Sequence, residues 1–293
     1  MTQKIPQLPW TDEQWDRVQQ VITEEARKAR VAANFLPIVG PLPPGSDYVS
    51  DDILDYENER FPPPALRMRV ADTTTRRLCT LEVRVSLRGP QVADPELSSA
   101  LQMFRRAANT LARLEDAIIF MGRTGNRPNA GTANLAPIWT VGPDAGADIG
   151  LSEAAIVGAV PVTTTATLVT AVSDAIGEIE AAGHAGPFAC VLDQGLFNLA
   201  QTSDRDSLVP PHDRILALLG GGPLLRSSAL EARPAQLGGV VMALGGAPVD
   251  LVVARDITLS FLQLTLEPRF VFRVHEKLVL RIKQEGAIVG LLT

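Results

Sequence analysis

Residues 94–122 read DPELSSALQMFRRAANTLARLEDAIIFMG, and this stretch decides the architecture of the chain. Asp94 can cap a helix, Pro95 fits its first turn, and Gly122 is a typical stop signal. Between these signals, apolar residues recur every three or four positions and predict one long amphipathic helix with a single buried stripe. The stripe consists of Leu97, Leu101, Phe104, Ala108, Leu111, Leu114, Ile118 and Met121.

The polar face of this predicted helix carries Arg105, Arg106, Arg113, Glu115 and Asp116. Adjacent helical residues point in different directions, so Glu115 and Asp116 are not expected to form a carboxylate dyad. We expect the whole face to be helix surface, where its charges form ion pairs. A long helix without a catalytic group favours a structural building block over an enzyme.

The composition indicates a globular protein with an acidic balance. Of the 293 residues 46% are hydrophobic, and the formal net charge of −6 argues against a nucleic-acid-binding protein. Cys79 and Cys190 lie far apart in apolar runs, which favours buried reduced thiols in a cytosolic protein, while a bond within or between subunits stays open. No run reaches the about 18 apolar residues that a membrane helix needs, and residues 1–15 lack the apolar core of a signal peptide.

The first third of the chain predicts a helix and a hairpin. An apolar stripe predicts a helix from Thr11 or Asp12 to about Phe35, before a Pro/Gly break at residues 36–45. Residues 65–72 and 78–87 alternate apolar and polar side chains, which predicts two strands with one wet face joined by an exposed turn. Such a long β-hairpin cannot bury its apolar face alone, so it requires a partner surface within the chain or on a neighbour.

The second half predicts a mixture of helices and strands. Residues 123–160 read as a loop region with short strands, and residues 165–182 as a helix. A buried strand at 187–193 ends in Asp193, which can cap the next short helix. A polar loop at 203–213 and a short helix at 214–219 follow, and the chain from Gly238 to Leu292 is nearly all strand.

No motif argues positively for catalysis. The three histidines, His184, His212 and His275, have no partner at the spacing of a metal site or a catalytic triad, and no serine lies in a G-x-S-x-G elbow. The glycines at 220–222 and 244–246 lack the Lys-Ser/Thr follower of a phosphate-binding loop. We therefore expect no catalytic residues, no bound cofactor and no metal.

Taken in order, the segments resemble the encapsulins, the shell proteins of bacterial and archaeal nanocompartments, including the chains known as linocin-type bacteriocins. LEDAIIFMG (114–122) resembles the family's E-D-x-x-x-F-x-G end of the long helix, and GHAGPFACVLD (183–193) resembles its G-H-x-G-P-[FY] turn and strand. The resemblance extends over nearly the whole chain. Its other carriers are Gly40-Pro41-Leu42, LCTLEVRVSLRGP (78–90), GGGPLLRSSAL (220–230), VARDITLSFL (253–262) and RFVFRVHEKLVLRIKQEGAIVGLL (269–292).

The resemblance implies an α+β fold like that of the HK97 phage capsid, with a peripheral (P) domain, an axial (A) domain and an extended E-loop. The implied divisions are an N-terminal arm and helix, the E-loop, the P-domain spine helix, the A-domain around five-fold axes, and closing strands shared by both domains. Their ranges are 1–45, 46–90, 91–160, 161–250 and 251–293.

The resemblance also implies an icosahedral cytoplasmic shell that encloses cargo enzymes recruited through C-terminal targeting peptides. Such cargo includes ferritin-like proteins and dye-decolourising peroxidases, and neither nucleic acid nor a membrane is expected as a partner. Two sets of residues are implied. Trp15, Val18, Ile22 and Ile288 would form the groove for the cargo peptide, and Asp204, Arg205, Asp206, His212 and Asp213 would border the five-fold pore.

Two rival functions stay open. A major capsid protein of a phage or prophage shares the fold but packages DNA, and neighbouring terminase and portal genes would favour it. A bacteriocin or protease-like enzyme belongs to a different class, and peptidase activity of a shell without cargo would favour it.

Overall fold

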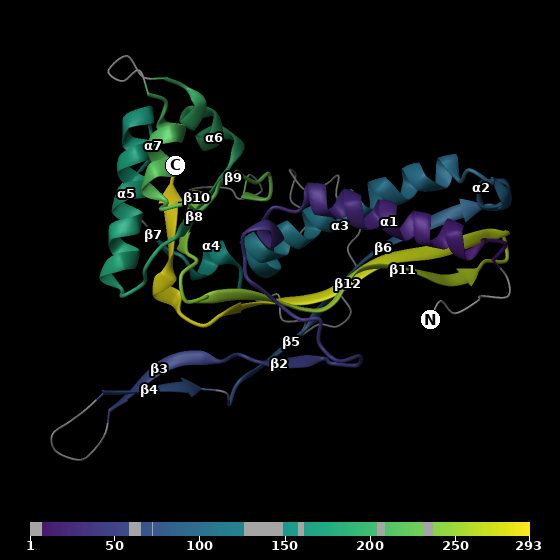
Figure 1. The fold of residues 1–293 in the computed structure, drawn as a ribbon, viewed down its shortest axis with the longest axis horizontal. Coiled ribbons are helices and arrows are strands. Elements are labelled where there is room, and N and C mark those ends of the chain that lie inside the picture. Colours follow the sequence, from purple (N-terminus) through teal and green to yellow (C-terminus); the bar gives the residue numbers. More distant parts are fainter. Residues whose placement is uncertain are drawn as a thin grey trace.

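The computed structural model describes residues 8–58, 66–71, 73–125, 149–157, 161–203, 209–230 and 237–293. They form two packed units and one projecting arm (Figure 1). The predicted strands within residues 123–148 and much of the predicted loop at 203–213 lie outside the described residues.

The long helix of the first unit, α3 (Ser98–Gly125), follows a short helix, α2 (Gly89–Ala93). Asp94 accepts hydrogen bonds from the amides of Glu96 and Ser98 (3.0 and 2.9 Å), so its predicted capping role is confirmed, although the helix starts later than expected. Gly122 interrupts the helix at φ +57°, a conformation that glycine adopts most readily, and the predicted stop signal is confirmed there.

The N-terminal helix, α1 (Asp12–Ala29), lies alongside α3 (Figure 1). The predicted start at Thr11 or Asp12 is confirmed, and Thr11 and Gln14 form a reciprocal capping box there. The prediction that the helix continues to about Phe35 is wrong. It ends at Ala29, and only a single 3₁₀ turn, η1 (Ala32–Asn34), follows.

Both helices cover one face of a four-stranded sheet with the order β1-β11-β12-β6 (Figure 1). Its strands are β1 (Ile38–Val39), β11 (Val249–Leu264), β12 (Arg269–Ile282) and β6 (Cys79–Arg88). Phe272 of β12 meets Phe104 of α3 edge to face at 5.4 Å and stacks on Trp10 at 4.9 Å. The alternating strand β6 turns its apolar side chains toward the helices and its polar ones to the opposite face.

The second unit is built on a five-stranded sheet with the order β7-β13-β10-β8-β9. Its strands are β7 (Ile156–Val157), β13 (Ile288–Leu292), β10 (Leu237–Ala243), β8 (Phe188–Leu192) and β9 (Leu224–Arg226). Its helices are α4 (Leu151–Ala154), α5 (Thr165–Ala181), α6 (Gln194–Gln201) and α7 (Pro211–Leu218). The predicted helix at 165–182 and the Asp193 cap are therefore confirmed.

This sheet is buried on both faces. Ala189 and Val191 of β8 join the core that contains α3, whereas Cys190 and Leu192 join a second core with α5, α6 and α7. Cys79 and Cys190 are free, buried and in different cores, and burial raises the pKa of each thiol to about 12. The predicted burial of both thiols is confirmed, and within the chain they do not bond to each other.

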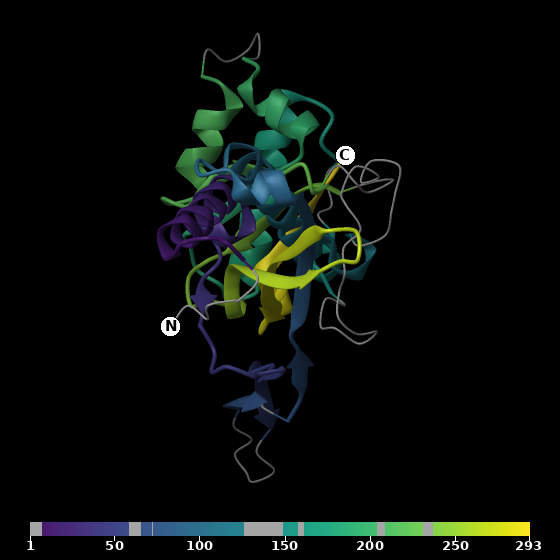
Figure 2. The same ribbon diagram turned by 90° about the vertical axis from the view of Figure 1, so that its right-hand side faces the viewer.

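The arm consists of two small antiparallel ladders and projects below the rest of the chain in both views (Figure 1 and Figure 2). β2 (Tyr48–Ser50) pairs with β5 (Thr75–Arg77), and β3 (Ile53–Asn58) pairs with β4 (Leu66–Ala71). The predicted pairing of residues 65–72 with 78–87 is wrong, because β6 instead pairs with β12 in the body. The chain does form a projecting hairpin. Its first two strands, β2 and β3, come from the acidic stretch that precedes residue 59.

Candidate functional site

The root of the arm is fixed by one arginine of the body. Arg281 of β12 donates to both carboxylate oxygens of Asp250 (2.9 and 2.8 Å), and it also donates to the Ser50 carbonyl (3.1 Å) and to Asp52. The carboxylates of Asp250 and Asp52 raise the pKa of the Arg281 guanidinium, so this side chain stays charged. The Arg281 guanidinium therefore ties the first strands of the arm to the end of the four-stranded sheet.

Further contacts reinforce this root. Arg76 of β5 forms an ion pair with Asp51, and Lys277 of β12 forms one with Asp47, while the Leu78 amide donates to the Asp47 carbonyl (2.9 Å). The outer ladder is different, because β3 and β4 pair only with each other among the described strands. The arm thus has a fixed direction at its root, and the hydrogen bond from the Leu54 amide to the Lys283 carbonyl (3.2 Å) joins the inner end of the outer ladder to the body.

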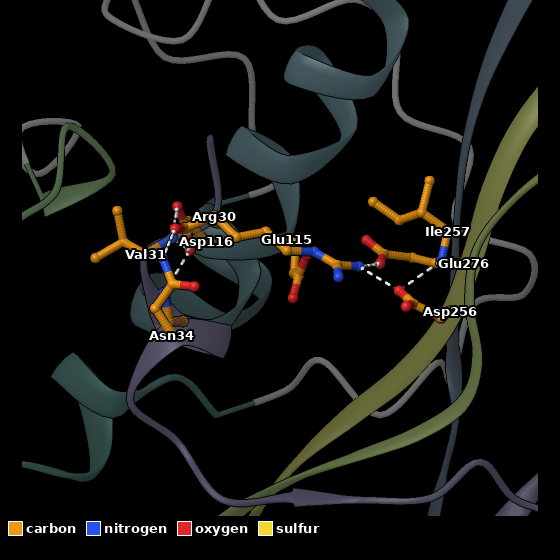
Figure 3. Close-up of polar contacts among 9 residues, drawn as sticks. Arg30, Val31, Asn34, Glu115, Asp116, Asp256, Ile257 and Glu276 are labelled. Atoms are coloured by element: carbon orange, nitrogen blue, oxygen red, sulfur yellow. Dashed lines mark hydrogen bonds and ion pairs between the residues drawn. The ribbon is translucent and has the colours of Figure 1, made fainter. Parts of the chain in front are cut away.

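A buried charge cluster joins the end of α1 to α3 (Figure 3). The Asp116 carboxylate accepts hydrogen bonds from the amides of Val31 (3.0 Å) and Ala32 (2.8 Å). These amides would otherwise bond to helical carbonyls, so Asp116 offers the chain an alternative to another turn of helix. This interaction explains why α1 ends before the predicted Phe35.

Arg30, the C-cap residue of α1, lies at the centre of the cluster (Figure 3). Its Nε lies 2.5 Å from Glu115 Oε2, and its Nη2 lies 2.6 Å from Glu276 Oε2 and 2.9 Å from Asp256 Oδ1. One guanidinium therefore binds carboxylates from α3, β12 and β11. Burial alone would lower the pKa of Arg30, but Glu115, Glu276 and Asp256 raise it.

The carboxyl groups of the cluster have raised pKa values. Glu115 and Glu276 are 1% and 0% exposed, and Asp116 is 4% exposed. Burial raises the pKa of Glu276 and of Asp116 to about 7, and burial together with the charge of Glu276 raises the pKa of Glu115 well above its ordinary value. Arg30 alone cannot neutralise all these carboxylates, which favours retention of protons near neutral pH.

The prediction that Glu115 and Asp116 lie on the helix surface is wrong, because the turn that follows α1 covers them. Their expected failure to act as a carboxylate dyad agrees with their separate partners, Arg30 for Glu115 and backbone amides for Asp116. Sequence reasoning missed Glu276. A signal was present, since Glu276 lies between Val274 and Leu278 on the alternating apolar face of its strand.

The residues expected at a cargo-peptide groove are mostly interior. Val18, Ile22 and Ile288 are each 0% exposed and belong to the core that contains α3, so they offer no surface to a peptide in this structure. Their apolar spacing reflects packing within the subunit. Trp15 is half-buried and packs against Trp10 with ring centroids 5.7 Å apart.

The residues expected at a five-fold pore are only partly described. Asp204, Arg205 and Asp206 lie outside the described residues. His212 and Asp213 lie in the first turn of α7, where His212 Nδ1 is 3.0 Å from Asp213 Oδ1 and the Asp213 side chain is 61% exposed. Asp213 therefore presents an accessible negative charge next to the loop.

The described residues contain no group of three or more metal-ligating side chains, and no described helix is long and apolar enough to span a membrane. His184 follows α5, and its amide donates to the Ile179 carbonyl (3.1 Å). His275 is buried on β12, and Arg255 Nη1 lies 3.2 Å from its Nε2.

Comparison with known proteins adds a family and a fold. A family model described as "Encapsulating protein for peroxidase" matches residues 2–130 and 142–279. The virus-like particle from Pyrococcus furiosus is similar in structure, with a TM-score of 0.66 at 15% sequence identity, covering 96% of this chain and 100% of that chain.

Chains from phages are also similar in structure. The capsid of Myoviridae phage XM1 has a TM-score of 0.60 at 10% identity and covers 87% of this chain and 89% of that chain. A chain of Mycobacterium phage Ogopogo has a TM-score of 0.62 at 14% identity and covers 90% of this chain and 92% of that chain. At these identities the likeness concerns the fold alone.

Proposed function

Since the chain belongs to the encapsulins, the family of encapsulating proteins for peroxidase, and has the HK97-like capsid fold, we propose that its copies assemble into a closed icosahedral shell. In such a shell each modest interface is used many times, and closure leaves no free edge. The two units described above take the places of the P-domain and the A-domain, and the arm takes that of the E-loop.

The observation that carries this proposal is the projecting arm. Its root is held by Arg281, Asp250 and Asp52, whereas its outer ladder, β3 and β4, pairs only with itself among the described strands. A two-stranded ladder is marginally stable in water unless another surface covers it. A neighbouring copy of the chain supplies that surface in the proposed shell, and the fixed root sets the direction in which the arm reaches it.

We propose that the shell encloses an enzyme and leaves the chemistry to it. The family description names a peroxidase, which supports a dye-decolourising peroxidase as cargo, and a ferritin-like oxidase is the second candidate. A C-terminal peptide of the cargo would dock with apolar anchors in a shallow groove. With Val18, Ile22 and Ile288 interior, Trp15 is the member of the expected set that retains exposed surface for such docking.

We also propose that the loop before α7 borders a pore at the five-fold axis. Symmetry would repeat Asp213 and its neighbours Asp204 and Asp206 around the axis, with Arg205 and His212 beside them. A ring of carboxylates raises the local concentration of cations and favours their entry. Replacing the three Asp residues by Asn tests this role, because cation entry into the filled shell is expected to become slower.

Electron microscopy of the chain expressed alone and purified by size exclusion tests the assembly. We expect uniform hollow particles of icosahedral outline. Monomers or small oligomers would contradict self-assembly. Particles that contain nuclease-protected DNA would favour the rival function, a phage capsid protein. Phage chains have a similar fold.

A further inference from the structure

The face of the four-stranded sheet opposite α1 and α3 contains a cavity of about 290 Å³. The strands β6, β11 and β12 form its floor, and the segment from Pro43 to Ser46, which leads into the arm, forms one wall. The basic side chains that line the cavity are Arg255, Arg273, His275 and Lys277. The strand register explains their convergence, since Arg255 lies opposite Lys277 and the other two alternate along the same face of β12.

The cavity carries an excess of positive charge. Two carboxylates face it, and both are already engaged. Asp47 pairs with Lys277, and Glu82 lies 2.7 Å from Arg84 and 3.7 Å from Arg273. Three cationic side chains, Arg255, Arg273 and Lys277, therefore line the cavity against these two carboxylates.

Arg255 has no carboxylate partner among the described residues, and the partner it has is the neutral ring of His275. The adjacent Asp256 does not compensate its charge, because Asp256 bonds to Arg30 in the buried cluster (Figure 3). An exposed arginine beside a cavity, with no acidic partner, is available to an anion from outside the chain.

The ring of His275 contributes a donor. Burial, together with the charges of Arg273 and Arg255, lowers the pKa of His275 to about 4 against the smaller opposing effects of Glu82 and the Thr258 backbone. The ring is therefore neutral at pH 7. Because a guanidinium only donates, Nε2 accepts from Arg255 Nη1 at 3.2 Å and the proton lies on Nδ1.

Two buried donors of this cavity are left without a well-placed acceptor. His275 Nδ1 and Arg273 Nε are both buried, and neither makes a hydrogen bond of acceptable geometry within the described part of the chain. A buried donor without an acceptor destabilises the fold, so such groups call for a ligand or solvent that accepts from them.

We propose that this cavity binds a phosphate group, either as the free ion or as part of a small phosphorylated molecule, through Arg255, Arg273 and His275. Guanidinium groups match the geometry of phosphate oxygens, and a phosphate offers acceptors to several donors at once. The volume lies near the lower end of that of small-molecule sites and exceeds what one phosphate needs. The site lies within one chain, so the proposal does not depend on assembly.

Calorimetric titration of the purified, assembled protein with inorganic phosphate and, in parallel, with glucose 6-phosphate tests the proposal. We expect saturable binding that weakens at least about tenfold in Arg255→Gln and in Arg273→Gln. Arg269→Gln is the matched control, because Arg269 lies on the same strand outside this cavity, and it is expected to leave the affinity within about twofold. Tighter binding of the sugar phosphate would identify a phosphorylated molecule as the ligand, and equal binding would identify the free ion.

Three outcomes would overturn the proposal. The first is the absence of saturable binding by either probe. The second is equal weakening in the two cavity variants and in the control, which would indicate a general effect of net charge. The third is binding of unchanged affinity in both Arg255→Gln and Arg273→Gln, which would place the phosphate at another site. Arg255 is exposed, so its substitution is expected to leave the fold intact, and circular dichroism of that variant verifies this.

Discussion

Arg30 and Glu276 are 246 positions apart in the chain, yet Arg30 Nη2 lies 2.6 Å from Glu276 Oε2. This contact links the C-terminal end of α1 to the middle of β12, and Glu115 of α3 completes the link through Arg30 Nε. The first unit therefore has a polar centre within its apolar core. The orientation of α1 depends on this centre, because α1 ends where the cluster begins.

Removal of the cation tests this dependence. Arg30→Ala leaves Glu115 and Glu276 buried without their common partner, and we expect it to lower the free energy of unfolding by about 3–5 kcal/mol. The measurement is the midpoint of chemical denaturation of the purified protein. Arg17→Ala is the matched control, because the Arg17–Glu96 pair is exposed (51% and 75%) and is expected to contribute at most about 1 kcal/mol. Equal effects of the two substitutions would contradict a stabilising role of the cluster.

The raised carboxyl pKa values predict how stability changes with pH. The pKa of Glu276 is about 7 in the folded chain against an ordinary value of 4.5, and that of Asp116 is about 7 against 3.8. Between the ordinary pKa values and pH 7 the folded state binds more protons than the unfolded state. The free energy of unfolding therefore falls as pH rises. We expect a decrease on the order of 3 kcal/mol from pH 4.5 to pH 7.5, seen as a falling melting temperature.

Glu276→Gln is the control for this pH effect. The amide oxygen still accepts from Arg30, while the group no longer titrates. We expect the melting temperature of this variant to depend less steeply on pH over the same interval. An unchanged slope would assign the effect to other groups, and a melting temperature that rises through this interval would contradict the raised pKa values.

The pairing of the arm strands shows where sequence reasoning failed. Residues 66–71 and 79–88 both alternate, and a local pattern identifies strands but not their partners. The correct partner of β4 is β3, where the register places Asp55 opposite Arg69 and Glu57 opposite Arg67. The sequence therefore carried a pairing signal in its acidic stretch, because residues of opposite charge fall at paired positions of the two strands.

The helices were predicted better than the site. The apolar period of α3 and α5 is local and survives in the structure, and so do the glycine stop at Gly122 and the Asp193 cap. The burial of Glu115 and Asp116 depends on a contact with the segment after α1, more than 80 positions away. The spacing of apolar residues along a helix carries no information about such a distant contact. A charge on an apolar strand face, as at Glu276, is the sequence feature that points to it.

The arm root is expected to control assembly. Arg281→Ala removes the paired hydrogen bonds to Asp250 and the contacts to Ser50 and Asp52, so the arm loses its fixed direction. We expect the fraction of protein in particles to fall at least about tenfold in size-exclusion chromatography, while circular dichroism of the subunit is retained. Arg281→Lys keeps the charge but not the paired geometry, and it is expected to assemble to an intermediate extent.

The matched control for Arg281 is again Arg17→Ala, which removes a charge of the same sign from an exposed pair. It is expected to assemble like the original protein. Normal particles of Arg281→Ala would refute the role of the root. A loss of secondary structure in Arg281→Ala would assign its effect to folding, and Arg281→Lys then decides whether geometry or charge is responsible.

Substitutions at two glycines of the second unit are expected to change its stability in opposite directions. A Cβ at Gly222 would lie 1.9 Å from the Phe188 carbonyl oxygen, a backbone atom of the buried strand β8 that cannot move alone. A Cβ at Gly177, inside α5, meets nothing within 4 Å. We expect Gly222→Ala to lower the free energy of unfolding by about 2 kcal/mol or more through overpacking. Gly177→Ala is expected to raise it by about 0.5–1 kcal/mol, because alanine favours a helix interior. Denaturation midpoints of both variants check this, and a change of the same sign in both would show that the contact between Gly222 and β8 does not limit the packing of this unit.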